Sequence, residues 1–178
     1  MQKAYLELNV LAFQEGDSAA FGRLYQHYHP RLRHFALRRV AQPSAVDDLL
    51  HNVWLKIQCN VKRLNDVNIF ESWLYRLLRW QIEDYYRQQQ RTMTIDPTDL
   101  RALQDEQSMA EITPAPGILA HLHQLAVDER MIIELHYLHE LEIAAIALVL
   151  EVPAGTVKSR LFRARQQLKA IYLASLEG

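Results

Sequence analysis

Apolar side chains recur every three or four residues through most of this 178-residue chain. The clearest stripe in the first part of the chain consists of Phe21, Leu24, Tyr25, Tyr28, Leu32 and Phe35. Such spacing places apolar side chains on one face of an α-helix, whereas a half-buried strand would need strict alternation. Only five glycines and six prolines interrupt the pattern. The sequence therefore predicts an all-α protein.

Two further helices are predicted after this first stripe. Pro43 and Ser44 interrupt the pattern, and Ser44 followed by Asp47 is typical of a helix N-cap with an acidic residue in the first turn. The helix that follows carries the apolar stripe Leu49, Leu50, Val53, Trp54 and Ile57. Residues 59–68 show no clear period and are predicted to form a loop, and residues 70–90 are predicted to form a third long helix.

Residues 93–116 divide the chain into two parts. This segment is acidic, contains three prolines and has only weak helical character. Such a composition is typical of a flexible linker. Two small helical domains, residues 1–92 and residues 117–178, are therefore expected on either side of it.

Charge is unevenly distributed along the chain, although the formal net charge is only −1. Twelve basic and six acidic side chains give residues 21–91 a net charge of +6, and residues 152–178 carry +4. Between them, residues 92–151 carry −9. Affinity for a polyanion depends on the positive potential within about one Debye length, roughly 8 Å at physiological salt. The two basic blocks therefore favour contact with nucleic acid.

The helix predicted for residues 70–90 carries large side chains on two opposite faces. One face supplies the core stripe Leu74, Leu77, Leu78, Ile82 and Tyr85. The opposite face alternates aromatic and basic side chains at Trp73, Arg76, Trp80 and Arg87. Because tryptophan stacks on unpaired bases and arginine neutralises phosphates, this face favours binding of single-stranded DNA. The alternative is that a neighbouring helix covers Trp73 and Trp80.

Two helices joined by a short turn at residues 153–155 end the chain, as in a helix-turn-helix. The last helix is expected to turn inward the residues Val157, Leu161, Ala164, Leu168 and Ile171. Its outer side and its start carry the candidate DNA contacts Thr156, Lys158, Ser159, Arg160, Phe162, Arg163 and Gln166. Such side chains can contact base edges, thymine methyls and phosphates in a major groove. Thr156 is expected to hold a phosphate together with free backbone N–H groups.

Over nearly the whole chain, these segments resemble the extracytoplasmic function (ECF, group 4) sigma factors of bacterial RNA polymerase. The first conserved helix and the polymerase-binding helix of that family resemble GDSAAFGRLYQHYHPRLRHFALRR and DDLLHNVWLKI. Its promoter-melting helix and its C-terminal helix-turn-helix resemble FESWLYRLLRWQIEDYYRQQQR and LEIAAIALVLEVPAGTVKSRLFRAR. The strings WLYR and GTVKSR…RAR, in this order around an acidic linker, make the resemblance specific.

The resemblance implies two roles for the first domain. It is expected to bind the clamp helices of the largest subunit of core RNA polymerase through Asp47, Asp48, Leu50, His51 and Trp54. It is also expected to open the −10 promoter element and to capture a flipped base in the loop of residues 62–69. The residues implied in this second role are Lys62, Arg63, Asn65, Asn68, Phe70, Trp73, Arg76, Trp80 and Arg87.

The second domain is expected, on the same resemblance, to bind the flap of the second-largest subunit and to recognise the −35 element with its last helix. The acidic linker would thread the RNA path of the polymerase as a nucleic-acid mimic. An anti-sigma factor is a partner of many family members. Trp80 departs from the usual Asn, Glu151 from the usual Gly at the turn, and Ala145 from the usual Glu. His51 and Asn52 replace a common Gln-Glu pair.

Two other functions are left open by the sequence. The C-terminal motif alone would suit a DNA-binding regulator that acts without polymerase. The eight histidines, with His136 and His139 at i, i+3 spacing and His121 and His123 upstream, would suit a metal hydrolase. However, no HExxH-like arrangement supplies a second ligand or a base. Solvated or core histidines are favoured, so no metal, cofactor or enzymatic activity is expected.

The sequence also favours a cytoplasmic location. It contains no stretch of about 18 apolar residues and no signal-peptide pattern. The single cysteine, Cys59, excludes an internal disulfide and suits a reducing compartment. Its side chain is expected to be a small buried hydrophobe.

Overall fold

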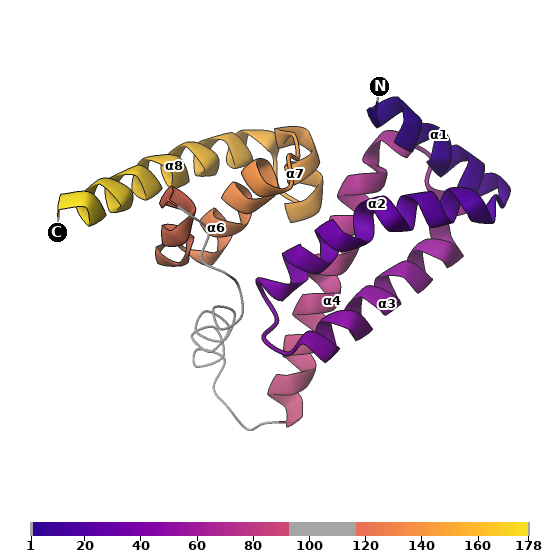
Figure 1. The fold of residues 1–178 in the computed structure, drawn as a ribbon, viewed down its shortest axis with the longest axis horizontal. Coiled ribbons are helices and arrows are strands. Elements are labelled where there is room, and N and C mark those ends of the chain that lie inside the picture. Colours follow the sequence, from indigo (N-terminus) through magenta and orange to yellow (C-terminus); the bar gives the residue numbers. More distant parts are fainter. Residues whose placement is uncertain (1, 93–116, 178) are drawn as a thin grey trace. The chain divides into compact units, whose positions relative to one another are not determined.

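The computed structural model of the protein describes residues 2–92 and 117–177, and every regular element within these ranges is helical. The described residues form two compact units, one before and one after residues 93–116 (Figure 1). The prediction of an all-α chain with two helical domains is therefore confirmed. The predicted linker itself lies outside the described residues.

Unit 1, residues 2–92, is built around three long helices. In chain order its elements are α1 (Gln2–Glu15), α2 (Ser18–Leu37), α3 (Pro43–Asn60), the short 3-10 helices η1 (Val61–Arg63) and η2 (Val67–Ile69), and α4 (Phe70–Thr92). Helices α2, α3 and α4 pack against one another, and α1 packs on α2 and on η1 and η2. The core between these helices includes Leu24, Leu32, Phe35, Leu50, Ile57, Leu74, Tyr75 and Leu78.

Most of the predicted apolar stripe of α2 is buried, but Tyr25 is not. Its exposed ring stacks on His29 one turn later, with 4.5 Å between ring centroids. Tyr75 of α4, which is not part of the predicted core stripe, is instead fully buried and meets Phe35 edge-on. Helical spacing therefore predicted most of the core residues but not those at the edges of each stripe. Whether such a residue is buried depends on the neighbouring helix.

Both ends of α3 differ from the prediction. Pro43 occupies the first helical position, where its missing N–H costs nothing, and the N-cap is Gln42 rather than Ser44. At the other end α3 continues to Asn60, and η1 and η2 follow. Most of the predicted loop 59–68 is therefore in short helical turns.

A glycine–aspartate turn joins α1 to α2. Gly16 has φ +103°, a conformation that favours glycine because a Cβ would be strained there. Its N–H donates to the Phe13 carbonyl, and the N–H of Asp17 donates to the Ala12 carbonyl, which closes the last turn of α1. The Asp17 carboxylate then caps α2 by accepting from the Ala19 N–H at 2.8 Å. Helix α1 itself precedes the first helix predicted from the sequence.

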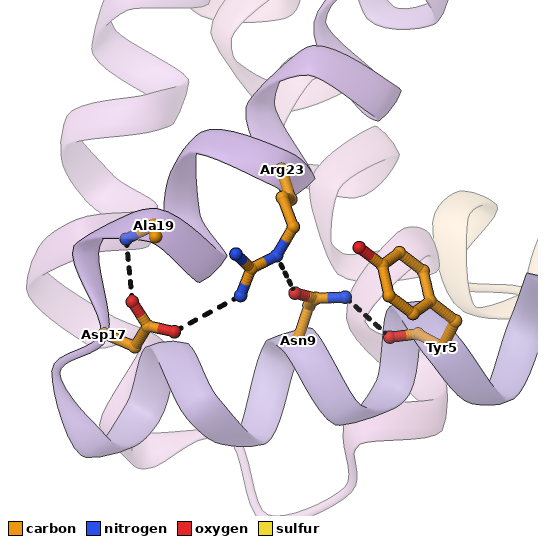
Figure 2. Close-up of polar contacts among 5 residues, drawn as sticks. All are labelled: Tyr5, Asn9, Asp17, Ala19 and Arg23. Atoms are coloured by element: carbon orange, nitrogen blue, oxygen red, sulfur yellow. Dashed lines mark hydrogen bonds and ion pairs between the residues drawn. The ribbon is translucent and has the colours of Figure 1, made fainter.

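Arg23 of α2 fastens α1 in place (Figure 2). Its guanidinium pairs with the Asp17 carboxylate at 3.2 Å and donates from Nε to Asn9 Oδ1. The Asn9 amide in turn donates to the Tyr5 carbonyl at 2.7 Å. Since Asn9 is buried, these partners avoid the cost of an unsatisfied amide and fix the position of α1 against α2.

Unit 2 is described from Gly117 to Glu177. Its elements are the 3-10 helix η3 (Gly117–Gln124), α6 (Val127–Ile133), the π-helical turn η4 (Glu134–Leu138), α7 (Ile143–Leu150) and α8 (Ala154–Glu177). Helix α8 contacts η3, α6 and α7. The predicted inward face of α8 is confirmed at the buried residues Val157, Leu161, Ala164 and Leu168, whereas Ile171 is half-buried.

Helices α7 and α8 form the predicted helix-turn-helix. Glu151 ends α7 in the left-handed conformation, with φ +57° and ψ +40°. A side chain in this conformation costs roughly 1–2 kcal/mol, which is why glycine is preferred at such a position. The Val152 N–H donates to the Ala147 carbonyl at 3.2 Å, and α8 begins two residues later.

The histidines considered as metal ligands make contacts within the protein. His136 Nδ1 lies 3.1 Å from the Leu141 carbonyl oxygen, His123 Nδ1 lies 2.9 Å from that of Ala120, and His139 is buried. Among the residues that the structure describes, no three His, Cys, Asp or Glu side chains gather as a metal site would require.

Two remaining features concern the surface. Cys59 is exposed on α3, so its predicted burial is wrong; α3 continues past the buried Ile57 and turns Cys59 outward. None of the helices in residues 2–92 and 117–177 is long and apolar enough to cross a membrane.

Candidate nucleic-acid interface

The outer face of α8 carries one large aromatic side chain among polar ones. Phe162 is 62% exposed. Ser159, Arg163 and Gln166 share its face and are also exposed. Because other apolar residues fill the inward positions of α8, Phe162 has no place in the core, and covering its ring with a partner would be favourable. The predicted outward placement of these four residues is confirmed.

The first turns of α8 are partly committed to contacts within the protein. Arg160 is half-buried and pairs with Asp128 of α6, with 3.4 Å between Nη1 and Oδ2. The Thr156 N–H donates to the Pro153 carbonyl at 2.9 Å, so it is not one of the free N–H groups expected to hold a phosphate. The Ser159 hydroxyl donates back to the Thr156 carbonyl at 3.0 Å.

Beside this outer face, a stripe of three basic residues runs along α8. Lys158, Arg165 and Lys169 are all exposed. Their i, i+7, i+11 spacing places the three side chains on one line of the helix. Of these three residues only Lys158 was predicted to contact DNA, although the spacing of all three is visible in the sequence.

The tryptophan–arginine face of α4 is only partly open. Trp73 and Arg76 are half-buried, while Trp80 is 39% exposed. The Arg76 guanidinium carbon lies 5.2 Å from the centroid of the Trp80 ring, in a cation–π contact. The buried Nε of Arg76 has no hydrogen-bond partner among the described residues. Neighbouring structure thus covers Trp73 in part, as the alternative interpretation held, and leaves Trp80 accessible.

Phe70 and Arg87, the first and last residues of α4 that were predicted to bind DNA, differ in exposure. Phe70 is 2% exposed and packs between Tyr28 and Trp73, at 5.7 and 6.3 Å between ring centroids. A side chain so buried cannot contact DNA in the folded protein, so Phe70 is a core residue and its predicted surface contact is wrong. Arg87 is exposed and pairs with Asp84 one turn earlier.

Residues 61–69 connect α3 to α4 and carry the remaining candidates for the −10 element. Lys62, Arg63, Asn65 and Asn68 are all exposed. Asp66 Oδ1 accepts from the Asn68 side-chain amide at 2.8 Å and from its backbone N–H at 2.9 Å. These bonds lower the pKa of the Asp66 carboxyl and keep it ionised. Local hydrogen bonds therefore stabilise the second half of the segment.

The predicted polymerase-binding residues of α3 divide between surface and core. Asp47, Asp48 and His51 are exposed, but Leu50 and Trp54 are buried. The last two belong to the inward stripe of α3, so their predicted direct contact with polymerase is wrong and they support the surface from beneath.

Two residues that were not among the predicted polymerase contacts extend this surface of α3. Leu55 is 45% exposed, and Asn52 is also exposed. Together with Asp48 and His51 they follow the spacing i, i+3, i+4, i+7 and share one helix face. That spacing, counted from Asp48, was the signal that could have identified them.

Aromatic packing fixes the inner side of α3. The Trp54 Nε1–H donates to His29 Nδ1 at 3.3 Å, and the Trp54 ring packs on Phe21 and Tyr25. Burial lowers the pKa of His29, which favours the neutral ring that can accept this hydrogen bond. Near the start of α3, Asp47 pairs with Arg33 of α2 at 3.1 Å.

Comparison with known proteins assigns both units. The family model for Sigma-70 region 2 matches residues 24–92, and the one for Sigma-70, region 4 matches residues 118–168. RNA polymerase sigma factor SigZ of Bacillus subtilis (strain 168) is 32% identical over 158 residues, covering 87% of this chain and 86% of that protein. The ECF RNA polymerase sigma-E factor of Escherichia coli (strain K12) is 27% identical, covering 87% of each.

Solved structures share the fold. CnrH in complex with the cytosolic domain of CnrY has a TM-score of 0.67 at 21% identity, covering 94% of this chain and 97% of that chain. The sigma factor RpoE in complex with the anti-sigma factor NepR from Bartonella quintana has a TM-score of 0.63 at 22% identity, covering 84% and 94%.

Units 1 and 2 thus correspond to regions 2 and 4 of the sigma-70 class of transcription initiation factors. Within that class, the chain belongs to the extracytoplasmic function (ECF) sigma factors of bacterial RNA polymerase. Such factors direct promoter-specific transcription by the polymerase, and this is the function of the chain.

Proposed function

We propose that α8 of unit 2 recognises the −35 element from the major groove. The observation that carries this proposal is the exposed outer face of α8, where Phe162 lies beside Ser159 and Arg163. Arg163 can donate two hydrogen bonds to a guanine edge, and Phe162 can cover a thymine methyl. The side stripe Lys158, Arg165 and Lys169 would contact phosphates and set the position of the helix on the duplex.

Unit 1 recognises and opens the −10 element in this proposal. Lys62, Arg63 and Asn65 would contact the non-template strand, and the accessible Trp80 ring would stack on an unpaired base. Unstacking a base costs a few kcal/mol, and stacking on an aromatic ring returns about 1–3 kcal/mol per base. Basic contacts must therefore supply part of the energy, which agrees with the net charge of +6 over residues 21–91.

Polymerase contacts complete the assignment. The exposed face of α3, formed by Asp48, His51, Asn52 and Leu55, would bind the clamp helices of the largest subunit, and unit 2 would bind the flap of the second-largest subunit. We assign the two domains to residues 1–92 and 117–178, with residues 93–116 as the acidic linker. The protein would act in the cytoplasm as an initiation factor rather than as an enzyme, and an anti-sigma factor would be its inhibitor.

Transcription by the holoenzyme on a promoter library randomised at both elements tests these assignments. Arg163→Ala and Arg165→Ala form a matched pair, because each removes one exposed arginine from the same helix. Arg163→Ala should flatten the base preference at one or two −35 positions. Arg165→Ala should lower transcription about equally on all sequences, as loss of a phosphate contact does.

Two outcomes would contradict the proposal. Equal effects of the two substitutions on base preference would remove the base-contacting role of Arg163. Sequence-specific DNA binding by the chain alone, without any transcription when core polymerase is added, would instead favour a regulator that acts without polymerase.

A further inference from the structure

We infer that Gln14 of α1 is a positioning residue for −10 recognition, because it holds the turn that presents Lys62 and Arg63. This inference rests on the proposed role of residues 61–69 at the −10 element. Gln14 lies upstream of the region 2 match, which begins at residue 24, and it is half-buried.

The amide of Gln14 spans the turn. Its Nε2 donates to the Val61 carbonyl at 2.8 Å and to the Leu64 carbonyl at 2.7 Å. A glutamine amide nitrogen carries two N–H donors, so both are used. The two carbonyls that it joins lie immediately before Lys62 and immediately after Arg63.

Burial shows which side of the turn Gln14 contacts. Val61 is buried and Leu64 and Gln14 are half-buried, whereas Lys62 and Arg63 are exposed. The Leu64 N–H also donates to the Val61 carbonyl at 3.1 Å, which closes the turn on itself. Gln14 therefore fastens the inner side of the turn while the two basic side chains project from its outer side.

The remainder of the segment is held independently. Asp66 fixes Asn68 through two hydrogen bonds, and its carbonyl accepts from the Ile69 N–H at 3.3 Å. Gln14 is in turn fixed because the Arg23–Asn9 contact fastens α1 to α2. Loss of the Gln14 contact would thus loosen the first half of the segment, which the Leu64–Val61 hydrogen bond would still close, and leave the second half unchanged. A turn held in its binding conformation loses less entropy when it captures the preferred base. A base that is not captured gains nothing from this order, so loosening the turn lowers the base preference.

Gln14→Glu and Gln14→Met test the inference in the full chain bound to core polymerase. Gln14→Glu keeps the shape but removes both donors and sets a carboxylate against two carbonyl oxygens; Gln14→Met removes the donors without adding charge. Gln26→Glu, at an exposed position of α2, is the control. The measurement is base preference at each position of a library randomised at both the −10 and −35 elements.

Both Gln14 variants should reduce the preference at the captured −10 base by about tenfold, because two hydrogen bonds that hold the turn are lost and part of their free energy is expressed in base capture. Preference at the −35 element, which the other unit recognises, should not change. Gln26→Glu should match the wild type at both elements.

Three results separate the possibilities. Equal loss of preference at both elements, or a lower yield with the base preferences retained, would mean that Gln14 only stabilises the fold, and this would overturn the inference. Full −10 preference in both Gln14 variants would overturn it as well. If the wild-type holoenzyme itself shows no −10 preference, the proposed function fails before the variants are compared.

Discussion

The outer face of α8 and the tryptophan–arginine face of α4 were both predicted to bind DNA, but they differ in how far they are open. On α8 the aromatic residue Phe162 is largely exposed, whereas of the three aromatic residues of α4 that were predicted to bind DNA, Phe70 is core, Trp73 is half-buried and Trp80 alone is exposed. The buried residues of α4, which include Phe70, Tyr75, Leu77 and Leu78, occupy a wider arc of the helix than the single buried stripe of α8. Helical period therefore predicts the exposed face of a helix best where the buried residues of that helix form one narrow stripe.

The two phenylalanines provide the largest test of this comparison. Phe70→Ala should lower the free energy of unfolding by about 3–5 kcal/mol, because it removes a buried ring and leaves a cavity. Phe162→Ala should change it by less than about 0.5 kcal/mol, as surface substitutions usually do. Urea unfolding of the full chain measures both. Similar losses for the two would break the distinction between the faces.

Arg163→Ala should weaken binding of the holoenzyme to the −35 element by about 1–3 kcal/mol if the side chain makes a bidentate base contact. Binding to promoter DNA is measured at constant salt, because phosphate contacts make affinity depend strongly on ionic strength. Its unfolding free energy should match that of the wild type. Unchanged affinity on an intact promoter would exclude the base contact.

Trp80→Ala should slow strand opening by about 1–2 kcal/mol of activation free energy, the lower part of the range for base stacking, since the ring is only partly accessible. Closed-complex formation should be unaffected. Permanganate reactivity of unpaired thymines follows opening, and binding at low temperature follows the closed complex. If both steps are equally impaired, Trp80 serves packing rather than base capture.

The smallest effects on stability are expected at two turns with positive φ, one at Gly16 in unit 1 and one at Glu151 in unit 2. Gly16→Ala should cost unit 1 about 1 kcal/mol, because alanine is strained at positive φ. Glu151→Gly should stabilise unit 2 by about 1 kcal/mol, because glycine adopts the left-handed conformation without the strain of a side chain. Thermal unfolding of the full chain detects both. Destabilisation by Glu151→Gly would mean that contacts of the Glu151 side chain outweigh its backbone strain.

Most of the candidate surfaces could be predicted from the sequence because they lie on helices. The helix-turn-helix and the outer face of α8 follow from inward residues at helical spacing. On α3 the contacts implied by the resemblance included Leu50 and Trp54, which are buried, and omitted Leu55, which is exposed. The resemblance named a helix there, and only the packing of α3 on α2 and α4 indicates which of its sides faces solvent.

By itself the sequence determined the all-α class, the two domains, the helix-turn-helix and the family, because each depends on local periodicity or on ordered motifs. The tertiary structure alone decided that Phe70 is core and that Cys59 is exposed, and it placed the Gln14 amide against the Val61 and Leu64 carbonyls. That contact joins residues 47 and 50 positions apart. No local pattern encodes such a contact, since it depends on how α1 packs against the rest of the unit.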